Sequence, residues 1–147
     1  MLAAFAALCF CAPASAHTDG ARQLAFGWPA QGTVTSPFGD DNGRWHSGID
    51  IGILRSLVVT AAAPGVVIDA GYLGGFEGYG NVVVVQVAPQ MVTLYAHLES
   101  ASVGRGEYVT AGQVLGTAGC TGWCTGTHLH FELREQGAAV DPRKFLG

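Results

Sequence analysis

The chain has 147 residues, which is the usual size of a single domain. Hydrophobic residues make up 49% of it and charged residues only 12%, so the composition predicts a globule and argues against disorder. A formal net charge of −4, without any basic cluster, excludes nucleic acid as a partner. The 22 glycines and many valines favour strands joined by tight turns, and we predict an all-β fold.

The first segment, residues 1–16, is almost wholly apolar and contains no charged side chain. It ends in Ala14-Ser15-Ala16, a small-x-small cleavage pattern, and its apolar run is too short for a membrane-spanning helix. We therefore predict a signal peptide at residues 1–16 and an exported protein, periplasmic or extracellular, with no membrane span after cleavage. No Lys or Arg precedes the apolar run, so the alternative is a buried N-terminal strand or helix.

Residues 17–31 form a short lead-in without periodicity, and residues 32–147 are predicted to form the single folded domain. The lead-in is too short for an inhibitory pro-domain, so we expect no built-in segment at the metal site. Cleavage after Ala16 would leave His17 at the N-terminus, where amine and ring can chelate copper, as in oxidative polysaccharide-cleaving enzymes. A copper oxidase is therefore an alternative, although the other histidines have a better explanation.

Several segments have the pattern of strands bounded by turn residues. We predict strands at residues 33–39, 57–61, 65–70 and 81–87. The last of these is a near-continuous apolar run, as expected for a strand buried on both faces. The glycine-rich loop at residues 71–80 contains Tyr72, Phe76 and Tyr79, which either border a groove or cover the edge of the core.

The segment that follows Arg44-Trp45 is the first candidate for site residues. His46 and Asp50 have the same strand parity, so both side chains can point to one face. Gly48 lies between them and allows a close backbone approach or a bend. Ile49 and Ile51 are then expected to face the core behind this pair.

Two later strands add further histidines. In residues 92–97 we expect Thr93, Tyr95 and His97 to share one face. In the run at residues 128–133 the polar side chains have one parity and the apolar ones the other. The polar set is His128, His130 and Glu132, and the apolar set is Leu129, Phe131 and Leu133. Two imidazoles on one strand face can reach a single site.

Cys120 and Cys124 are the only cysteines outside the predicted signal peptide. Export to an oxidising compartment favours a disulfide between them, which stabilises by roughly 2 kcal/mol and stiffens the loop before the His-x-His strand. The rival is a structural zinc site that adds His128 and His130. Zinc fingers separate their histidines by about three to five residues, and only one residue intervenes here, so we favour the disulfide.

Zinc in hydrolases is typically held by three protein ligands, with a fourth position for water whose pKa falls to about 7. His46, Asp50 and one member of the His128/His130 pair supply such a set. The remaining histidine of that pair and His97 are candidates for proton transfer and for stabilising the tetrahedral oxyanion.

Glu132 shares the parity of the two histidines. The chain has no His-Glu-x-x-His motif to supply the usual glutamate base of zinc proteases, so Glu132 could be proposed instead. Its position favours a role behind a metal ligand, or a structural role.

Six segments occur in the order found in lysostaphin/LytM-type zinc metallopeptidases, which this chain resembles from about residue 32 to residue 146. They are residues 35–39 (TSPFG), 46–51 (HSGIDI), 78–81 (GYGN), 93–98 (TLYAHL), 112–116 (GQVLG) and 125–132 (TGTHLHFE). Asp141-Pro142 matches the closing signature of that family. Each motif alone is weak, but the ordered set is a strong signal.

This resemblance implies a compact antiparallel β-domain with an active-site groove over a central sheet. It also implies one zinc ion per chain, with His46, Asp50 and His130 as ligands. His97 and His128 are implied to assist catalysis. The implied substrates are the stem or cross-bridge peptides of peptidoglycan, which agrees with export.

The chain departs from the family pattern at Thr127, where proline is frequent, at the cysteine pair and at residues 52–59. None of these changes removes a ligand or an assisting histidine, so they bear on rim shape and substrate choice. The rival function is a non-catalytic domain of the same fold that binds cell wall or activates another hydrolase, with a regulatory protein partner. Such relatives usually lack ligands, which this chain retains.

Overall fold

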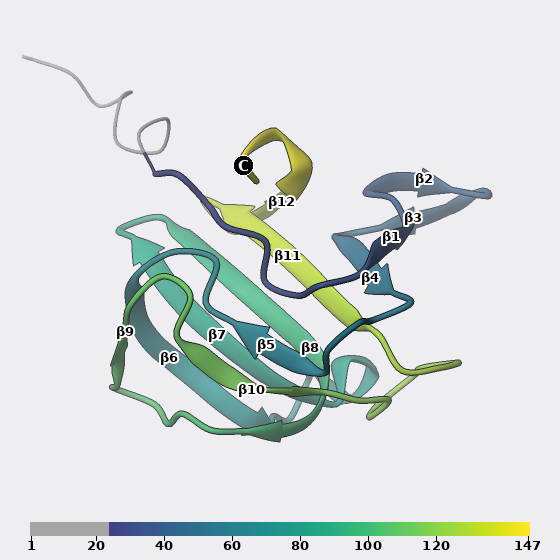
Figure 1. Ribbon diagram of the computed structural model, residues 1–147. Coiled ribbons are helices and arrows are strands. Elements are labelled where there is room, and N and C mark those ends of the chain that lie inside the picture. Colours follow the sequence, from purple (N-terminus) through teal and green to yellow (C-terminus); the bar gives the residue numbers. More distant parts are fainter. Residues whose placement is uncertain (1–23) are drawn as a thin grey trace, which may run out of the picture.

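The structure, a computed structural model, describes residues 24–147, whose regular elements are almost all β-strands (Figure 1). The strands are β1 (Thr33–Ser36), β2 (Gly39–Asp41), β3 (Arg44–His46), β4 (Ile49–Gly52), β5 (Val58–Thr60), β6 (Gly65–Tyr72), β7 (Asn81–Ala88), β8 (Met91–Ala101), β9 (Tyr108–Val109), β10 (Val114–Ala118), β11 (Leu129–Glu135) and β12 (Ala138–Val140). Two short 3-10 helices, η1 (Glu77–Tyr79) and η2 (Pro142–Lys144), complete this part of the chain. The predicted signal peptide and His17 lie outside the described residues.

All strand pairings in residues 24–147 are antiparallel apart from one isolated bridge, which confirms the predicted all-β, antiparallel fold. The main sheet follows the order β1-β4-β11-β8-β7-β6-β9, with β12 beside β11 and β10 between β5 and β8. Strands β2 and β3 form a separate hairpin that projects from the β1–β4 side of the sheet (Figure 1). No helix within the described residues is long and apolar enough to cross a membrane.

The main sheet is covered by apolar side chains on both faces at β7. Val83 and Val85 join the main core, whereas Val82 and Val84 join a second, smaller cluster on the opposite face. This alternation confirms the predicted strand that is buried on both sides. The strands predicted at residues 57–61 and 65–70 are also present as β5 and β6. These two strands do not pair with each other. Strand β5 pairs with β10, and β6 pairs with β7 and β9.

The segment before β1 is part of the packed structure. Phe26 is only 2% exposed and belongs to the main core. Its ring contacts that of Phe145 edge-on at 6.0 Å, and its backbone forms a bridge with Leu146. The two ends of the described chain therefore close together over the same core.

Gly48 precedes β4 at the point where the chain crosses β11. A Cβ atom at this position would overlap the carbonyl oxygen of Phe131 and contact the side chain of Glu132. The expected close backbone approach is therefore present. Ile49 and Ile51, at 0% and 1% exposure, face the core as predicted.

We predict that Gly48→Ala destabilises the metal-free protein by about 2 kcal/mol or more, because the backbone of β4 or β11 must move to admit the methyl group. Urea denaturation in the presence of a chelator measures the change. Gly74→Ala is the matched control, since a Cβ there meets nothing within 4 Å. Equal stability of the two variants would contradict this packing account.

Candidate metal and catalytic site

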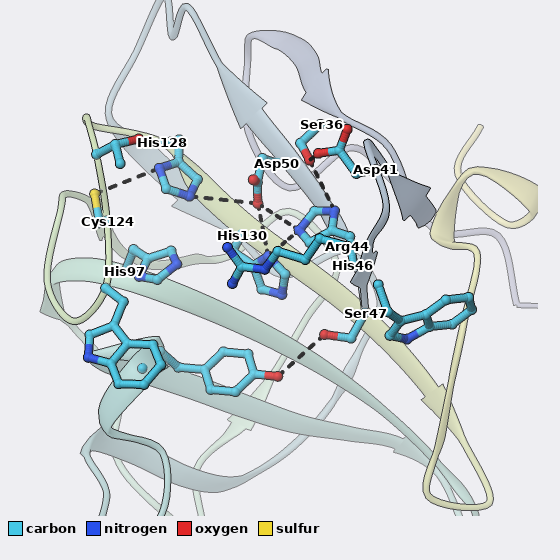
Figure 2. A pocket seen from close by; sticks show the side chains of 15 residues that line it. Ser36, Asp41, Arg44, His46, Ser47, Asp50, His97, Cys124, His128 and His130 are labelled. Carbon is cyan, nitrogen blue, oxygen red and sulfur yellow. Dashed lines mark hydrogen bonds and ion pairs between the residues drawn. The ribbon is translucent and has the colours of Figure 1, made fainter.

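His46, Asp50 and His130 converge from three different strands, β3, β4 and β11, beside the β4–β11 pair (Figure 2). His130 and Asp50 are direct register partners on β11 and β4, which brings His130 Nδ1 within 2.8 Å of Asp50 Oδ1. His46, at the end of β3, places Nε2 3.0 Å from His130 Nδ1 and 3.2 Å from Asp50 Oδ1. These residues form a group that could hold a metal ion.

Each of the two imidazoles is oriented by a hydrogen bond on its far side. His46 Nδ1 lies 2.8 Å from the carbonyl oxygen of Pro37, and His130 Nε2 lies 2.9 Å from Glu132 Oε1. Because carbonyl and carboxylate oxygens only accept hydrogen bonds, these ring nitrogens carry the protons. The lone pairs of His46 Nε2 and His130 Nδ1 then face each other, an arrangement that requires a shared proton or cation.

Glu132 is fully buried and accepts hydrogen bonds from several donors besides His130. They are Ser47 Oγ at 2.5 Å, Tyr79 OH at 2.8 Å and Arg134 Nε at 2.6 Å. Burial alone would raise the pKa of Glu132, but the hydrogen bonds from His130, Arg134 and Ser47 outweigh it and lower the pKa to about 2. Glu132 is therefore an ionised support behind His130, which favours this role over that of a general base.

The three converging groups also shift one another's pKa. Burial would raise the pKa of Asp50, but hydrogen bonds from His130 and His46 hold it well below its usual range. Burial would lower the pKa of His130, but hydrogen bonds to Asp50 and Glu132 raise it to about 8. The hydrogen bond to Asp50 likewise raises the pKa of His46. Without a metal, a proton takes the place of a cation between these groups.

The donor set fits zinc. Two imidazole nitrogens and one carboxylate oxygen are typical ligands of a catalytic zinc site, and tetrahedral bonds of about 2.0–2.1 Å place ligand atoms about 3.3 Å apart. The three donor atoms here are separated by 2.8, 3.0 and 3.2 Å, so small shifts suffice. Hydrogen bonds already fix both histidines in the required tautomers.

His97 reaches the same site through a bulge in β8. Asn81 pairs with Leu98 and Val83 with Tyr95, so Ala96 and His97 together oppose Val82. His97 has a positive φ of 60°, which reverses the side to which its ring points. The prediction that Thr93, Tyr95 and His97 share a face was therefore wrong for His97. Thr93 and Tyr95 face the main core, on the other side of the sheet from the site. Their register partners on β11 are Leu133 and Phe131, which belong to the same core.

His128 lies just before β11 and its ring centroid is 4.7 Å from that of His97. The two residues are linked through Gly119, whose N–H donates to the carbonyl of His97 and whose carbonyl accepts from the N–H of His128. His128 Nε2 lies 3.6 Å from Asp50 Oδ1. His128 is thus held by a short bridge, rather than by the strand in which the sequence pattern places it.

Backbone carbonyls fix the rings of His97 and His128. His97 Nδ1 lies 2.7 Å from the carbonyl oxygen of Thr121, and His128 Nδ1 lies 2.7 Å from that of Gly126. Each Nδ1 therefore donates, so in a neutral imidazole the acceptor is Nε2. Burial lowers the pKa of His97, so its neutral form is favoured.

Cys120 and Cys124 form a disulfide, as predicted. This excludes the alternative zinc site, because both thiols are consumed by the bond. The disulfide closes the loop that presents the Thr121 carbonyl to His97 and leads to the Gly126 carbonyl beside His128. It therefore stiffens the segment that orients both histidines.

The site opens into a cavity of about 410 Å³ between the β2–β3 hairpin and the disulfide loop (Figure 2). Its lining residues are Ser36, Asp41, Arg44, Trp45, His46, Ser47, Asp50, Gly78, Tyr79, His97, Trp123, Cys124, Thr125, His128 and His130. Two of the three aromatic residues of the glycine-rich loop take the two predicted roles, and the third takes neither. Tyr79 borders the cavity, Phe76 covers the second core, and Tyr72 is 62% exposed.

The five residues predicted as metal ligands or assisting histidines all line this cavity: His46, Asp50, His97, His128 and His130. Reasoning from strand parity missed Ser47, Tyr79 and the Thr121 carbonyl. Ser47 lies inside the HSGIDI motif, which was its only sequence signal, whereas Tyr79 was also predicted as a loop aromatic that borders a groove or covers the core edge. Nothing in the sequence indicates a particular backbone carbonyl as a histidine anchor.

Comparison with known proteins gives a consistent family assignment. A model of peptidase family M23 matches residues 44–142. The murein hydrolase activator NlpD of Salmonella dublin is 35% identical over 133 residues, which cover 90% of this chain and 34% of the relative. The DD-carboxypeptidase/endopeptidase Mpg of Neisseria meningitidis serogroup B is 41% identical over 115 residues, covering 74% and 26%. The chain thus spans about a third of these relatives or less.

Solved structures agree with the fold. A zinc-containing peptidase from Vibrio cholerae superposes with a TM-score of 0.71 at 31% identity, covering 80% of this chain and 39% of that one. The catalytic domain of lysostaphin from Staphylococcus simulans gives a TM-score of 0.63 at 30% identity, covering 84% and 92%. The resemblance to lysostaphin/LytM-type domains is confirmed.

We predict that zinc affinity rises with pH up to about 8, the pKa of His130. Below that pH a proton occupies the lone pair that zinc must use, so affinity falls about tenfold per pH unit for each proton displaced. Competition with a chelator from about pH 6 to about pH 9 measures this dependence. In Glu132→Gln one cause of the raised pKa is lost, so the steep region moves to lower pH. An affinity independent of pH would refute the assigned ligand atoms.

Replacing both cysteines, in Cys120→Ser/Cys124→Ser, is predicted to lower stability by about 2 kcal/mol and to leave zinc binding intact. Loosening of the loop should expose the Nδ1 proton of His97 to solvent exchange. Proton NMR of the imidazole region follows that exchange, with the reduced wild-type protein as a parallel sample. Unchanged protection of the ring proton would show that the disulfide has no part in orienting His97.

Proposed function

Because the chain belongs to peptidase family M23, we propose that it is a zinc-dependent endopeptidase acting on peptidoglycan. The bonds cut are peptide bonds in stem peptides or cross-links. The support is one arrangement: a ligand group of His46, Asp50 and His130 that shares a cavity with two further oriented histidines. Export to the periplasm or cell wall, as predicted from the sequence, would bring the enzyme to this substrate.

One zinc ion per chain would be held by His46 Nε2, Asp50 Oδ1 and His130 Nδ1. When bound, it supplies a water of lowered pKa and polarises the substrate carbonyl. The hydrogen bonds from His46 to Pro37 and from His130 to Glu132 hold the two rings in place. Because Glu132 stays ionised, it also increases the basicity of His130 toward the metal.

His97 and His128 supply the proton transfers that hydrolysis of a peptide bond requires. Each has Nδ1 committed to a backbone carbonyl, so Nε2 is available to accept the proton of the attacking water. The imidazole that accepts this proton becomes a donor, so the pair can then stabilise the tetrahedral oxyanion and protonate the leaving amine. The low pKa of His97 keeps it ready to accept.

The second candidate function is activation of another peptidoglycan hydrolase without cleavage. It is favoured by the similarity to NlpD, whose name describes a murein hydrolase activator. In that case the cavity would bind a peptide or a protein segment, and a regulatory protein would be the partner. An activator needs no oriented proton acceptors, so the retained His97 and His128 favour the peptidase.

The test is mass spectrometry of purified peptidoglycan fragments after incubation with the zinc-loaded chain, with and without a chelator. We expect chelator-sensitive conversion of cross-linked dimers to monomers. His130→Ala should reduce the rate at least about 1,000-fold, because it removes a metal ligand. His17→Ala is the control, and only the copper-oxidase alternative predicts that it loses function.

If the fragments remain unchanged while zinc is shown to be bound, the peptidase proposal is refuted. The activator function would then be tested by adding the chain to a separate murein hydrolase. Stimulation that survives His130→Ala would establish it.

A further inference from the structure

Arg44 lies on β3, two residues before His46, and alternate residues of a strand point to the same face. It lines the same cavity as His46, Asp50 and His130. Figure 2 shows its side chain extending into the pocket, in the direction of His46 and His130. The guanidinium is therefore presented to whatever occupies the cavity.

Arg44 also differs from most other arginines of residues 24–147 in its pairing. Arg105, Arg134 and Arg143 form ion pairs with Asp69, Glu132 and Asp141. Within the described part of the chain, Arg44 takes part in no ion pair and is the only Lys or Arg that lines the cavity.

The nearest acidic residue along the hairpin is already engaged. Asp41, the register partner of Arg44, accepts hydrogen bonds from Ser36 Oγ at 2.5 Å and Asn42 Nδ2 at 2.9 Å. An unpaired guanidinium in a cavity is suited to bind an anion of the ligand, and its planar fork fits a carboxylate with two parallel hydrogen bonds.

We propose that Arg44 is a specificity-determining residue that binds a free carboxylate of the substrate peptide, on a residue next to the scissile bond. This inference rests on the proposed peptidase function. Two strand residues span about 7 Å, so the Cα atom of Arg44 lies about 7 Å from the Cα atom of His46. In the proposed function the carbonyl of the bond that is cut lies at the metal ligands, so the carboxylate that Arg44 binds belongs to a neighbouring residue.

The experiment compares two synthetic peptides that differ in one group. One carries a free carboxylate on the residue next to the scissile bond, and the other carries a carboxamide there. The zinc-loaded full chain should cleave the carboxylate peptide with a kcat/KM roughly ten- to a hundredfold higher, as expected for a charge-assisted bidentate contact.

In Arg44→Gln this ratio of kcat/KM values should fall to about one. Arg44→Lys should retain an intermediate ratio, because it keeps the charge but loses the fork. Arg55→Gln is the matched control, since Arg55 is exposed and lies outside the cavity lining, and it should keep the wild-type ratio. Zinc content is measured for every variant.

Two outcomes would overturn the inference. One is a kcat/KM ratio near one for the wild-type chain. The other is an unchanged ratio in Arg44→Gln, which would assign carboxylate recognition to another group such as the metal. If the wild-type chain binds zinc but cleaves neither peptide, the proposed function has failed separately. Calorimetric binding of the same two peptides then decides. If the preference for the carboxylate peptide disappears in Arg44→Gln, Arg44 is the residue that binds the carboxylate. If the preference persists, the inference is refuted.

Discussion

The hydrogen bond between His130 Nε2 and the buried Glu132 is the interaction on which the rest of the site depends. It gives the His130 ring its tautomer and turns Nδ1 toward Asp50 and His46. Glu132 can remain charged in the interior only because Ser47, Tyr79 and Arg134 also donate to it. Gly48 admits this arrangement, since any larger residue there would displace Phe131 or Glu132. The ligand group thus lies at the cavity end of a buried, hydrogen-bonded polar network.

A second set of constraints orients the assisting histidines independently of the first. Backbone carbonyls of Thr121 and Gly126, on and beside the disulfide loop, accept from His97 and His128. The site therefore separates into a candidate ligand group held by the sheet and two further histidines, His97 and His128, whose rings are held by loop carbonyls. In the proposed peptidase, such a division would allow loops to change substrate choice while the ligand group stays in place, because that group depends on strand register instead.

The relatives of this chain include both a named activator and a named peptidase. Family membership therefore supports the fold and the cell-wall context more than it supports one activity. What favours hydrolysis is the chemistry of the cavity: three zinc-type donors and two imidazoles whose free nitrogens are acceptors. A surface used only to bind a partner has no need of that combination.

Local pattern was sufficient for much of this protein. Alternation predicted that Ile49 and Ile51 face the core, and a near-continuous apolar run predicted that the strand at residues 81–87 is buried on both faces. Ordered motifs indicated the family and the residues His46, Asp50, His97, His128 and His130.

Tertiary structure decided how those side chains are used. A bulge with a positive φ at His97 reversed its predicted face, and pairing of β11 with β4 set His130 beside Asp50. Which ring nitrogen faces the metal group, and which carbonyl holds each ring, depend on contacts between residues far apart in the chain. Parity along one strand carries no information about such contacts.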